Sequence, residues 1–107
     1  CGNPVYLNGS HGYIQSPGYM NDSCNQYRDS ENCTWEISVG DGMEIELMFN
    51  EIEIEKCDEC NCDVLKLDDG HQRIQLCGLK ESFLYRSTGS WLYVEFSTDS
   101  SVTSRGF

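Results

Sequence analysis

Short stretches in which apolar and polar residues mostly alternate recur along this chain. They cover residues 35–39, 43–49, 65–68 and 92–96. Alternation with a period of two is the pattern of a half-buried β-strand, because successive side chains of a strand point to opposite faces. No stretch combines a helical period with capping residues. The chain is therefore predicted to be all-β, an antiparallel two-sheet β-sandwich built from short strands.

Glycine-rich segments separate these stretches and predict the turns. Gly40-Asp41-Gly42 stands between residues 35–39 and 43–49, which predicts a β-hairpin made of those two strands. The apolar positions of residues 92–96 are expected to face the core. That orientation leaves Trp91 on the outer face of the same sheet.

Length and charge exclude several classes of function. The chain has 107 residues, which fits one domain, and its 7 basic and 18 acidic side chains give a net charge of −11. This acidity argues against binding to nucleic acids and to anionic lipid, which both require lysine and arginine. No apolar run is long enough to span a membrane. Because the chain opens directly on Cys1 with no signal peptide, we expect residues 1–107 to be a single domain taken from a larger extracellular protein.

Cysteine content and glycosylation motifs both point to the outside of the cell. Seven cysteines in a chain of this length are typical of oxidising compartments, where disulfides persist. Three tripeptides match the N-glycosylation acceptor pattern, and their asparagines are Asn8, Asn21 and Asn32. We therefore expect a secreted or membrane-anchored glycoprotein.

An ordered set of short motifs covers nearly the whole chain. In chain order these are Cys1, Gly12-Tyr13-Ile14, Ser16-Pro17-Gly18-Tyr19, Cys33-Thr34-Trp35-Glu36-Ile37, Cys60-Asn61-Cys62-Asp63, Cys77-Gly78, Phe96-Ser97-Thr98-Asp99-Ser100-Ser101 and Gly106-Phe107. Their order and spacing resemble those of the CUB domain family. The resemblance implies a jelly-roll-like sandwich that is extracellular and not itself catalytic. The family's last strand normally runs several residues past the final Gly-Phe, so a truncated final strand is expected here.

The same resemblance implies two disulfide bonds. In the family pattern, Cys1 pairs with Cys33 and Cys60 pairs with Cys77. Each bond would close a loop of moderate length and stabilise the fold by roughly 2–4 kcal/mol.

Three cysteines remain after these pairings, namely Cys24, Cys57 and Cys62. Cys62 occupies the place of a tyrosine in the family pattern. We hypothesise a third bridge from Cys24 to Cys57 or Cys62, with the odd cysteine either free or bonded to another chain. The spacing Cys57-x-x-Cys60-x-Cys62 is also compatible with a zinc cluster, although an oxidising compartment favours disulfides.

Acidic residues crowd the middle of the chain. Residues 41–69 hold eleven carboxylates, which only Lys56 and Lys66 oppose. Most of these carboxylates are interpreted as solvated side chains of strands or as turn residues. The solvated ones are Glu44, Glu46, Glu51 and Glu53, and the turn residues are Asp41, Asp68 and Asp69.

Three other acidic residues are assigned to a metal site. Glu55 and Asp63 flank Cys60, and Asp99 lies in a late loop. In the calcium-binding subset of CUB domains the matching residues coordinate one Ca²⁺ ion, together with a backbone carbonyl, here that of Ser101. Calcium prefers several hard oxygen ligands, which loop carboxylates supply flexibly. Without a cation the crowded carboxylates would repel one another and raise their pKa values.

The expected function follows from the charge that remains at this site. Three carboxylates and one Ca²⁺ ion leave a single negative charge, which suits capture of a lysine or arginine side chain from an extracellular protein partner. Related calcium-binding CUB domains bind basic residues in this way, so Glu55, Asp63 and Asp99 are also expected to bind the partner. The alternative is a glycan-binding module, as in spermadhesins. Neither function is enzymatic, and the isolated His11 and His71 give no reason to expect a catalytic triad.

Overall fold

Short strands make up almost all the regular structure in residues 5–8, 11–19 and 26–107, the parts of the chain that the computed structural model describes. The elements are, in chain order, β1 (Val5–Leu7), β2 (Asn32–Ser38), β3 (Glu46–Phe49), β4 (Ile52–Ile54), the 3-10 helix η1 (Asp58–Cys60), β5 (Val64–Asp68), β6 (Arg73–Leu76), β7 (Gly78–Lys80), β8 (Phe83–Arg86) and β9 (Trp91–Ser97). No helix in the described ranges is long and apolar enough to cross a membrane. The predicted all-β class is confirmed.

Five strands form the larger sheet, in the order β1-β2-β9-β5-β6. At its centre β2 and β9 pair antiparallel over their full lengths, from Asn32 opposite Ser97 to Ser38 opposite Trp91. β5 pairs antiparallel with both β9 and β6, whereas β1 runs parallel to β2. Since side chains alternate along each strand, the apolar positions of β2, β5 and β9 gather on one face of this sheet.

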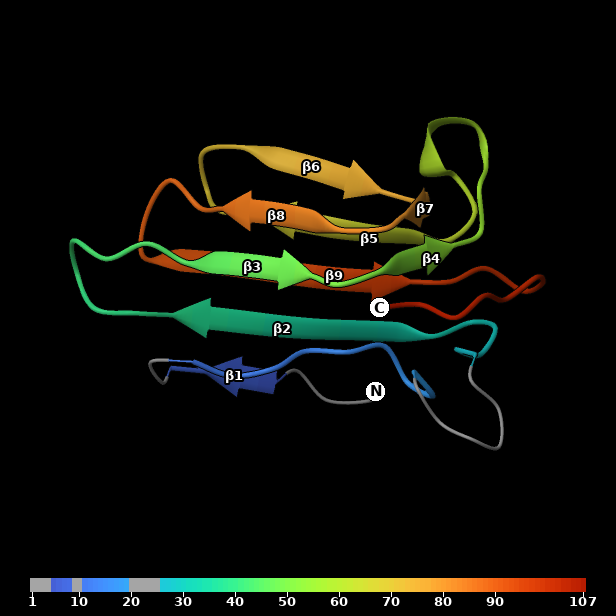
Figure 1. Cartoon of the computed structure of the whole chain (residues 1–107), viewed down its shortest axis with the longest axis horizontal. Coiled ribbons are helices and arrows are strands. Elements are labelled where there is room, and N and C mark those ends of the chain that lie inside the picture. The colour runs from blue at the N-terminus through green and yellow to red at the C-terminus, as the bar shows by residue number, and fades with distance from the viewer. Residues whose placement is uncertain (1–4, 9–10, 20–25) are drawn as a thin grey trace.

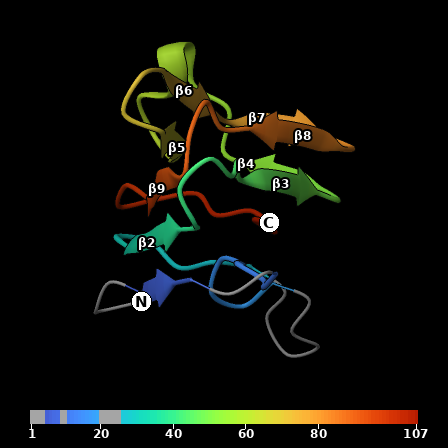
Figure 2. The same cartoon turned by 90° about the vertical axis from the view of Figure 1, so that its left-hand side faces the viewer.

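A second layer of strands covers that apolar face. It consists of the antiparallel pairs β3–β8 and β4–β7. Figure 1 shows β3 and β8 in front of β9 and β5, and Figure 2 shows the two layers side by side. The predicted β-sandwich is therefore confirmed.

The hairpin predicted around Gly40-Asp41-Gly42 is wrong. β2 pairs with β9 and β3 pairs with β8, so these consecutive strands belong to different layers. The connection between them is anchored on both sides. The N–H of Val39 donates to the carbonyl of Ser90 at 2.9 Å, and the N–H of Ile45 donates to Ser87 Oγ at 2.8 Å. Because β2 and β3 lie in different layers on opposite sides of the core, both strands bury their apolar sides.

The core lies between the two layers. The apolar residues of β9 that were predicted to face it are completely buried: Leu92, Val94 and Phe96. Phe107 reaches this core from the C-terminal end of the chain and is 4% exposed. Its ring lies edge-on to three others, at centroid distances of 5.9 Å from Trp35, 5.9 Å from Phe49 and 5.2 Å from Phe96.

The last residues pack against the second layer without forming a regular strand. Gly106 and Glu53 exchange backbone hydrogen bonds of 2.8 and 2.9 Å, which make an isolated antiparallel bridge. The carbonyl of Phe107 accepts the N–H of Ser16 at 3.0 Å. Whether the final strand is truncated, as the family resemblance implied, stays a prediction.

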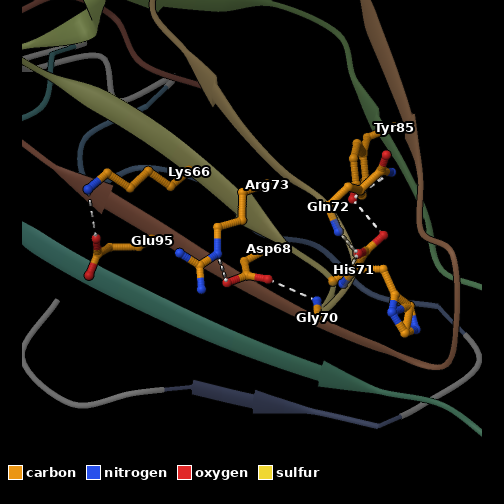
Figure 3. Close-up of polar contacts among 9 residues, drawn as sticks. Lys66, Asp68, Gly70, His71, Gln72, Arg73, Tyr85 and Glu95 are labelled. Atoms are coloured by element: carbon orange, nitrogen blue, oxygen red, sulfur yellow. Dashed lines mark hydrogen bonds and ion pairs between the residues drawn. The ribbon is translucent and has the colours of Figure 1, made fainter.

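Trp91 lies on the outer face of the larger sheet, as predicted. It is half-buried, and its indole N–H donates to Glu36 Oε1 at 2.8 Å. Its ring stacks beside that of Tyr93 at a centroid distance of 6.4 Å. Two ion pairs lie on the same face (Figure 3), Lys66–Glu95 at 3.8 Å and Asp68–Arg73 at 3.0 Å.

Asp69 is a turn residue, as predicted, but its carboxylate is buried rather than solvated. Its Oδ1 accepts the N–H groups of His71 and Gln72 at 2.9 and 2.8 Å. Its Oδ2 accepts the hydroxyl of Tyr85 at 3.0 Å and the N–H of Thr88 at 2.9 Å. Figure 3 shows His71, Gln72 and Tyr85 around this turn. Burial alone would raise the pKa of Asp69, but these hydrogen bonds outweigh it and hold the pKa well below its usual value.

Replacing Asp69 with asparagine should remove a pH-dependent part of the stability. In the unfolded chain the pKa of Asp69 is about 3.9, whereas in the folded chain it is lower. Ionised Asp69 therefore stabilises the fold fully above the unfolded-state pKa. This contribution is lost as the pH falls toward the folded-state pKa. We expect the variant to lose about 1–3 kcal/mol of unfolding free energy at pH 7 and much less at pH 2, measured by urea denaturation. The exposed Asp58→Asn should change little, and an equal loss of stability at both pH values for Asp69→Asn would contradict this account.

Candidate metal site

Three strand ends bring Glu55, Asp63 and Asp99 together at one end of the sandwich. Glu55 directly follows β4, Asp63 directly precedes β5, and Asp99 follows the end of β9. Val64 is the partner of Ser97, so the residue before β5 lies beside the residues after β9. The structure places carboxylate oxygens of all three acids within 4.8 Å of one another.

Tyr27 links two of these acids. Its hydroxyl donates to Asp63 Oδ2 at 2.6 Å and accepts the backbone N–H of Glu55 at 3.1 Å. The residue is 2% exposed, and its ring lies edge-on to Phe96 at 5.0 Å. Burial and the hydrogen bond to Asp63 raise the pKa of Tyr27 well above its usual value, so its hydroxyl stays protonated and keeps donating at neutral pH.

Tyr27 is not among the site residues expected from the sequence. This residue lies outside the alternating stretches, and a single tyrosine in a loop carries no spacing that marks it as a partner of distant carboxylates. Asp29 was also missed, although its charge contributes to the raised pKa of Glu55. The only signal available was an aromatic residue close in sequence to an acidic one, which is too common to select a site.

Asp63 is completely buried, and both of its oxygens accept hydrogen bonds. Besides the Tyr27 hydroxyl on Oδ2, Oδ1 accepts the backbone N–H of Asp99 at 2.8 Å. Burial raises the pKa of Asp63, and these hydrogen bonds offset only part of the effect. An ionised carboxylate in such surroundings gains stability from a nearby cation.

One side-chain oxygen of Glu55 has no hydrogen-bond partner within the described part of the chain. Its Oε1 is buried, and no group among the described residues donates a hydrogen bond to it. Desolvation raises the pKa of Glu55, and the negative charges of Asp99, Asp63 and Asp29 raise it further. A buried oxygen of this kind costs free energy unless a cation or a water molecule satisfies it.

Asp99 lies in a loop that is held from two sides. Thr98 Oγ1 donates to the carbonyl of Arg28 at 2.8 Å and accepts the N–H of Glu31 at 2.7 Å. Ser101 is exposed, and its N–H donates to Asp99 Oδ1 at 3.2 Å. The contribution expected from the Ser101 carbonyl stays a prediction.

The carboxylates of Glu55, Asp63 and Asp99 suit a calcium ion as ligands. All three side chains offer hard carboxylate oxygens, and none of them forms an ion pair with a basic side chain in the described ranges. Oxygen ligands on flexible loops are what calcium prefers, whereas zinc favours nitrogen and sulfur. Cys57, Cys60 and Cys62 are in disulfide bonds and offer zinc no thiolate.

Two disulfide bonds tie down the segment between Glu55 and Asp63. Cys60 bonds to Cys77, as the family resemblance implied. Cys57 bonds to Cys62, so the bridge hypothesised from Cys24 to either of these residues is wrong. The turn of η1 reverses the chain and brings the Cα atoms of Cys57 and Cys62 to 5.8 Å, a separation that a disulfide spans without backbone movement.

Other predicted residues lie partly outside the described ranges. Cys33 is disulfide-bonded, but Cys1 and Cys24 lie outside those ranges, so the Cys1–Cys33 pairing and the odd cysteine stay predictions. Of the glycosylation motifs, Asn8 and Asn32 are exposed, and Asn21 lies outside the described residues. Glycosylation at these positions also stays a prediction.

The acidic residues interpreted as solvated divide into two groups. Glu44 and Glu46 are exposed, as predicted. The prediction is wrong for Glu51 and Glu53, which are half-buried because Arg105 packs against them. Glu51 Oε1 accepts Arg105 Nη1–H at 2.9 Å, and Glu53 Oε2 accepts the backbone N–H of Arg105 at 3.2 Å.

Comparison with known proteins gives a match over the full length of the chain. A family model described as the CUB domain matches residues 1–107. Mouse Tolloid-like protein 2 is 37% identical over 101 residues, which cover 90% of this chain and 10% of that protein. The chain thus spans about a tenth of the length of this curated relative.

Solved structures contain the same fold. The full extracellular region of zebrafish Gpr126/Adgrg6 matches with a TM-score of 0.87 at 30% identity, over 97% of this chain and 14% of that one. The MASP-1 CUB2 domain bound to Ca²⁺ matches with a TM-score of 0.82 at 24% identity, over 95% of this chain and 91% of that one. At that identity the second likeness concerns the fold alone.

Proposed function

The chain belongs to the CUB domain family, and from this premise we propose that it is an extracellular, non-catalytic module that mediates protein–protein interaction through a calcium site. The observation that carries the proposal is the convergence of Glu55, Asp63 and Asp99 within 4.8 Å, with a buried oxygen of Glu55 that no described residue pairs with. A domain of the same fold, MASP-1 CUB2, is bound to Ca²⁺, which supports the proposal at the level of the fold.

Each of the three acids would contribute to the site in a different way. Asp63 is oriented by the Tyr27 hydroxyl and the Asp99 N–H, so its carboxylate is fixed before any ion binds. Glu55 offers Oε1, which no donor in the described residues occupies. Asp99 offers its carboxylate from the loop after β9, and the carbonyl of Ser101 is proposed as a further ligand. When bound, calcium supplies two positive charges to this acidic group.

We place the partner-binding surface at the same three carboxylates. Three negative charges and one divalent cation leave one negative charge, which attracts a lysine or arginine side chain. The net charge of −11 should also speed the encounter with a basic partner, most strongly at low ionic strength. Cys62 stands where the family pattern has a tyrosine, so the captured side chain loses one packing surface.

Removing calcium should lower the melting temperature. A ligand at about 100 times its Kd stabilises the folded state by about 2.7 kcal/mol, so EDTA should lower the Tm on the order of ten degrees. Asp99→Ala should abolish this difference between calcium and EDTA, whereas the exposed Glu44→Ala should keep it. Differential scanning calorimetry measures all three. A wild-type Tm that is identical in calcium and in EDTA would rule out the site.

Glycan binding remains the second candidate, and one feature of the outer face favours it. A groove of about 340 Å³ over β5, β6 and β9 is lined by Tyr93 and by two ion pairs. These pairs, Lys66–Glu95 and Asp68–Arg73, are drawn in Figure 3. An aromatic ring beside polar groups with no net charge suits a neutral sugar. Calcium-dependent binding to a lysine-rich peptide, with competition by free lysine, favours the first function. Binding to a neutral-sugar array that EDTA and lysine leave unchanged favours the second.

The domain is proposed to act within a larger extracellular protein. The chain spans only a tenth of Tolloid-like protein 2, so the partners of the whole protein are set by more than this module. Five cysteines of the described ranges are disulfide-bonded, which leaves the odd cysteine to be Cys1 or Cys24. We propose that it is either free or bonded to another chain.

A further inference from the structure

A short loop joins two of the proposed calcium ligands, and disulfide bonds hold it. Glu55 precedes Cys57 by two positions, and Asp63 directly follows Cys62. The Cys57–Cys62 bond spans a sequence separation of 5, and a second bond ties Cys60 of the same loop to the segment between β6 and β7. The first bond therefore closes the loop whose two ends carry the ligands.

Other interactions of this loop are few in the described structure. Asp58, Glu59 and Asn61 are exposed, and η1 buries none of its residues. Its internal backbone hydrogen bonds run from Cys60 N–H to Cys57 O and from Asn61 N–H to Asp58 O, each at 3.2 Å. Glu59 and Cys60 adopt left-handed φ angles of 55° and 53°, a region that residues with a side chain disfavour. Covalent links are thus the main constraint on the conformation of the loop.

The Cys57–Cys62 bond also borders the proposed site directly. The Sγ atoms of both cysteines lie within 4.8 Å of a carboxylate oxygen of Glu55. The same distance limit groups Glu55 with the carboxylates of Asp63 and Asp99. A disulfide donates no hydrogen bond. On this side the bond therefore restricts where the Glu55 side chain can lie, but it does not satisfy the carboxylate oxygens.

We propose that the Cys57–Cys62 disulfide is a positioning element of the calcium site, which holds Glu55 and Asp63 at ligand spacing before the ion arrives. This inference rests on the calcium site proposed above. A loop that is ordered in the free protein loses less conformational entropy on binding, so affinity is higher with the bond than without it. Groups that orient metal ligands typically contribute about 10–100-fold to metal affinity, and we expect about tenfold here.

The test compares calcium binding with and without the bond. Isothermal titration with CaCl₂ should give a Kd about tenfold higher for Cys57→Ser/Cys62→Ser than for the wild type. Cys57→Ala/Cys62→Ala should show the same loss, because both pairs remove the covalent link whatever the polarity of the new side chains. Disulfide mapping must confirm that Cys60–Cys77 is intact in each variant, and circular dichroism that each is folded.

Two controls separate positioning from general stability. Asn61→Ser changes a side chain of the same loop, but it leaves the charge of the loop and the Cys57–Cys62 bond unchanged. Ile37→Val removes part of a half-buried side chain on β2, away from the site, and should lower stability modestly. Both controls should keep the Kd of the wild type, because neither acts on the spacing of Glu55 and Asp63.

A second readout needs no calcium. The N–H of Asp99 donates to Asp63 Oδ1 at 2.8 Å, so its hydrogen exchange reports whether Asp63 is held in place. Exchange of this amide should be faster in the two bond-free variants and unchanged in both controls. If the calcium Kd and the hydrogen exchange of the Asp99 amide are the same with and without the Cys57–Cys62 bond, the positioning role is overturned. The proposed calcium site itself would be unaffected by that result. A wild-type chain that binds no calcium would overturn both.

Discussion

Replacing Gly106 with alanine is expected to lower the unfolding free energy by roughly 2–5 kcal/mol. Gly106 has a φ of 88°, where any residue with a side chain is strained. An added Cβ would overlap Ser16 Oγ and would lie 3.0 Å from Ser16 Cβ and 3.3 Å from Tyr27 Cδ2. Ser16 Oγ accepts the N–H of Phe107 at 3.0 Å, so displacing it also loosens the aromatic cluster at the core.

Urea denaturation measures this loss, and Gly89→Ala is its control. Gly89 has an ordinary backbone conformation, and an added Cβ there would meet no atom within 4 Å. The control should change the unfolding free energy by less than about 1 kcal/mol. A Gly106→Ala variant as stable as the control would show that the C-terminal segment contributes little to the fold.

Replacing Tyr27 with phenylalanine is expected to lower the unfolding free energy by about 2–3 kcal/mol, although the ring and its packing stay. The change removes the donor to Asp63 Oδ2 and the acceptor of the Glu55 N–H in one step. Asp63 is completely buried, so solvent does not replace the lost donor. If calcium binds as proposed, its Kd should also rise by about tenfold, because the orientation of Asp63 is lost.

Tyr13→Phe is the matched control, since Tyr13 is 93% exposed. It removes the same hydroxyl from a solvated position and should leave both the stability and the Kd unchanged. Calorimetry and calcium titration on the same samples provide both values. A Tyr27→Phe variant that matches Tyr13→Phe in both would show that Asp63 is held by its other contacts.

Alternation predicted the buried residues of β9 but not which strands are neighbours, and it failed for Met43, which precedes β3 and is 61% exposed. The period of two placed Leu92, Val94 and Phe96 in the core, because that pattern depends only on the geometry of one strand. The partner of a strand depends on the whole chain. β2 and β3 are close in sequence and joined by a glycine-rich turn, yet each bonds to a strand that lies far along the sequence.

The site shows the same division between local pattern and distant contact. Glu55, Asp63 and Asp99 were found through a motif, and the structure brings them together. Tyr27 was not found, because its role comes from a loop that meets β4 and β5 only in the folded chain. The Cys57–Cys62 bond was missed for a local reason, namely that a sequence separation of 5 becomes a disulfide only through the reversal at η1.

The pairing of β2 with β9 sets the order in which this domain can assemble. Cys33 lies opposite Phe96, so the central ladder of the larger sheet closes only after most of the chain has been made and brought together. Long-range pairings of this kind slow folding, because the entropy of loop closure must be overcome before the contacts form. Glu55 and Asp63 are near neighbours in the chain, but Asp99 joins them only once β9 is in place. An ion that needs all three would therefore be taken up last, and its uptake would mark a domain that has finished folding.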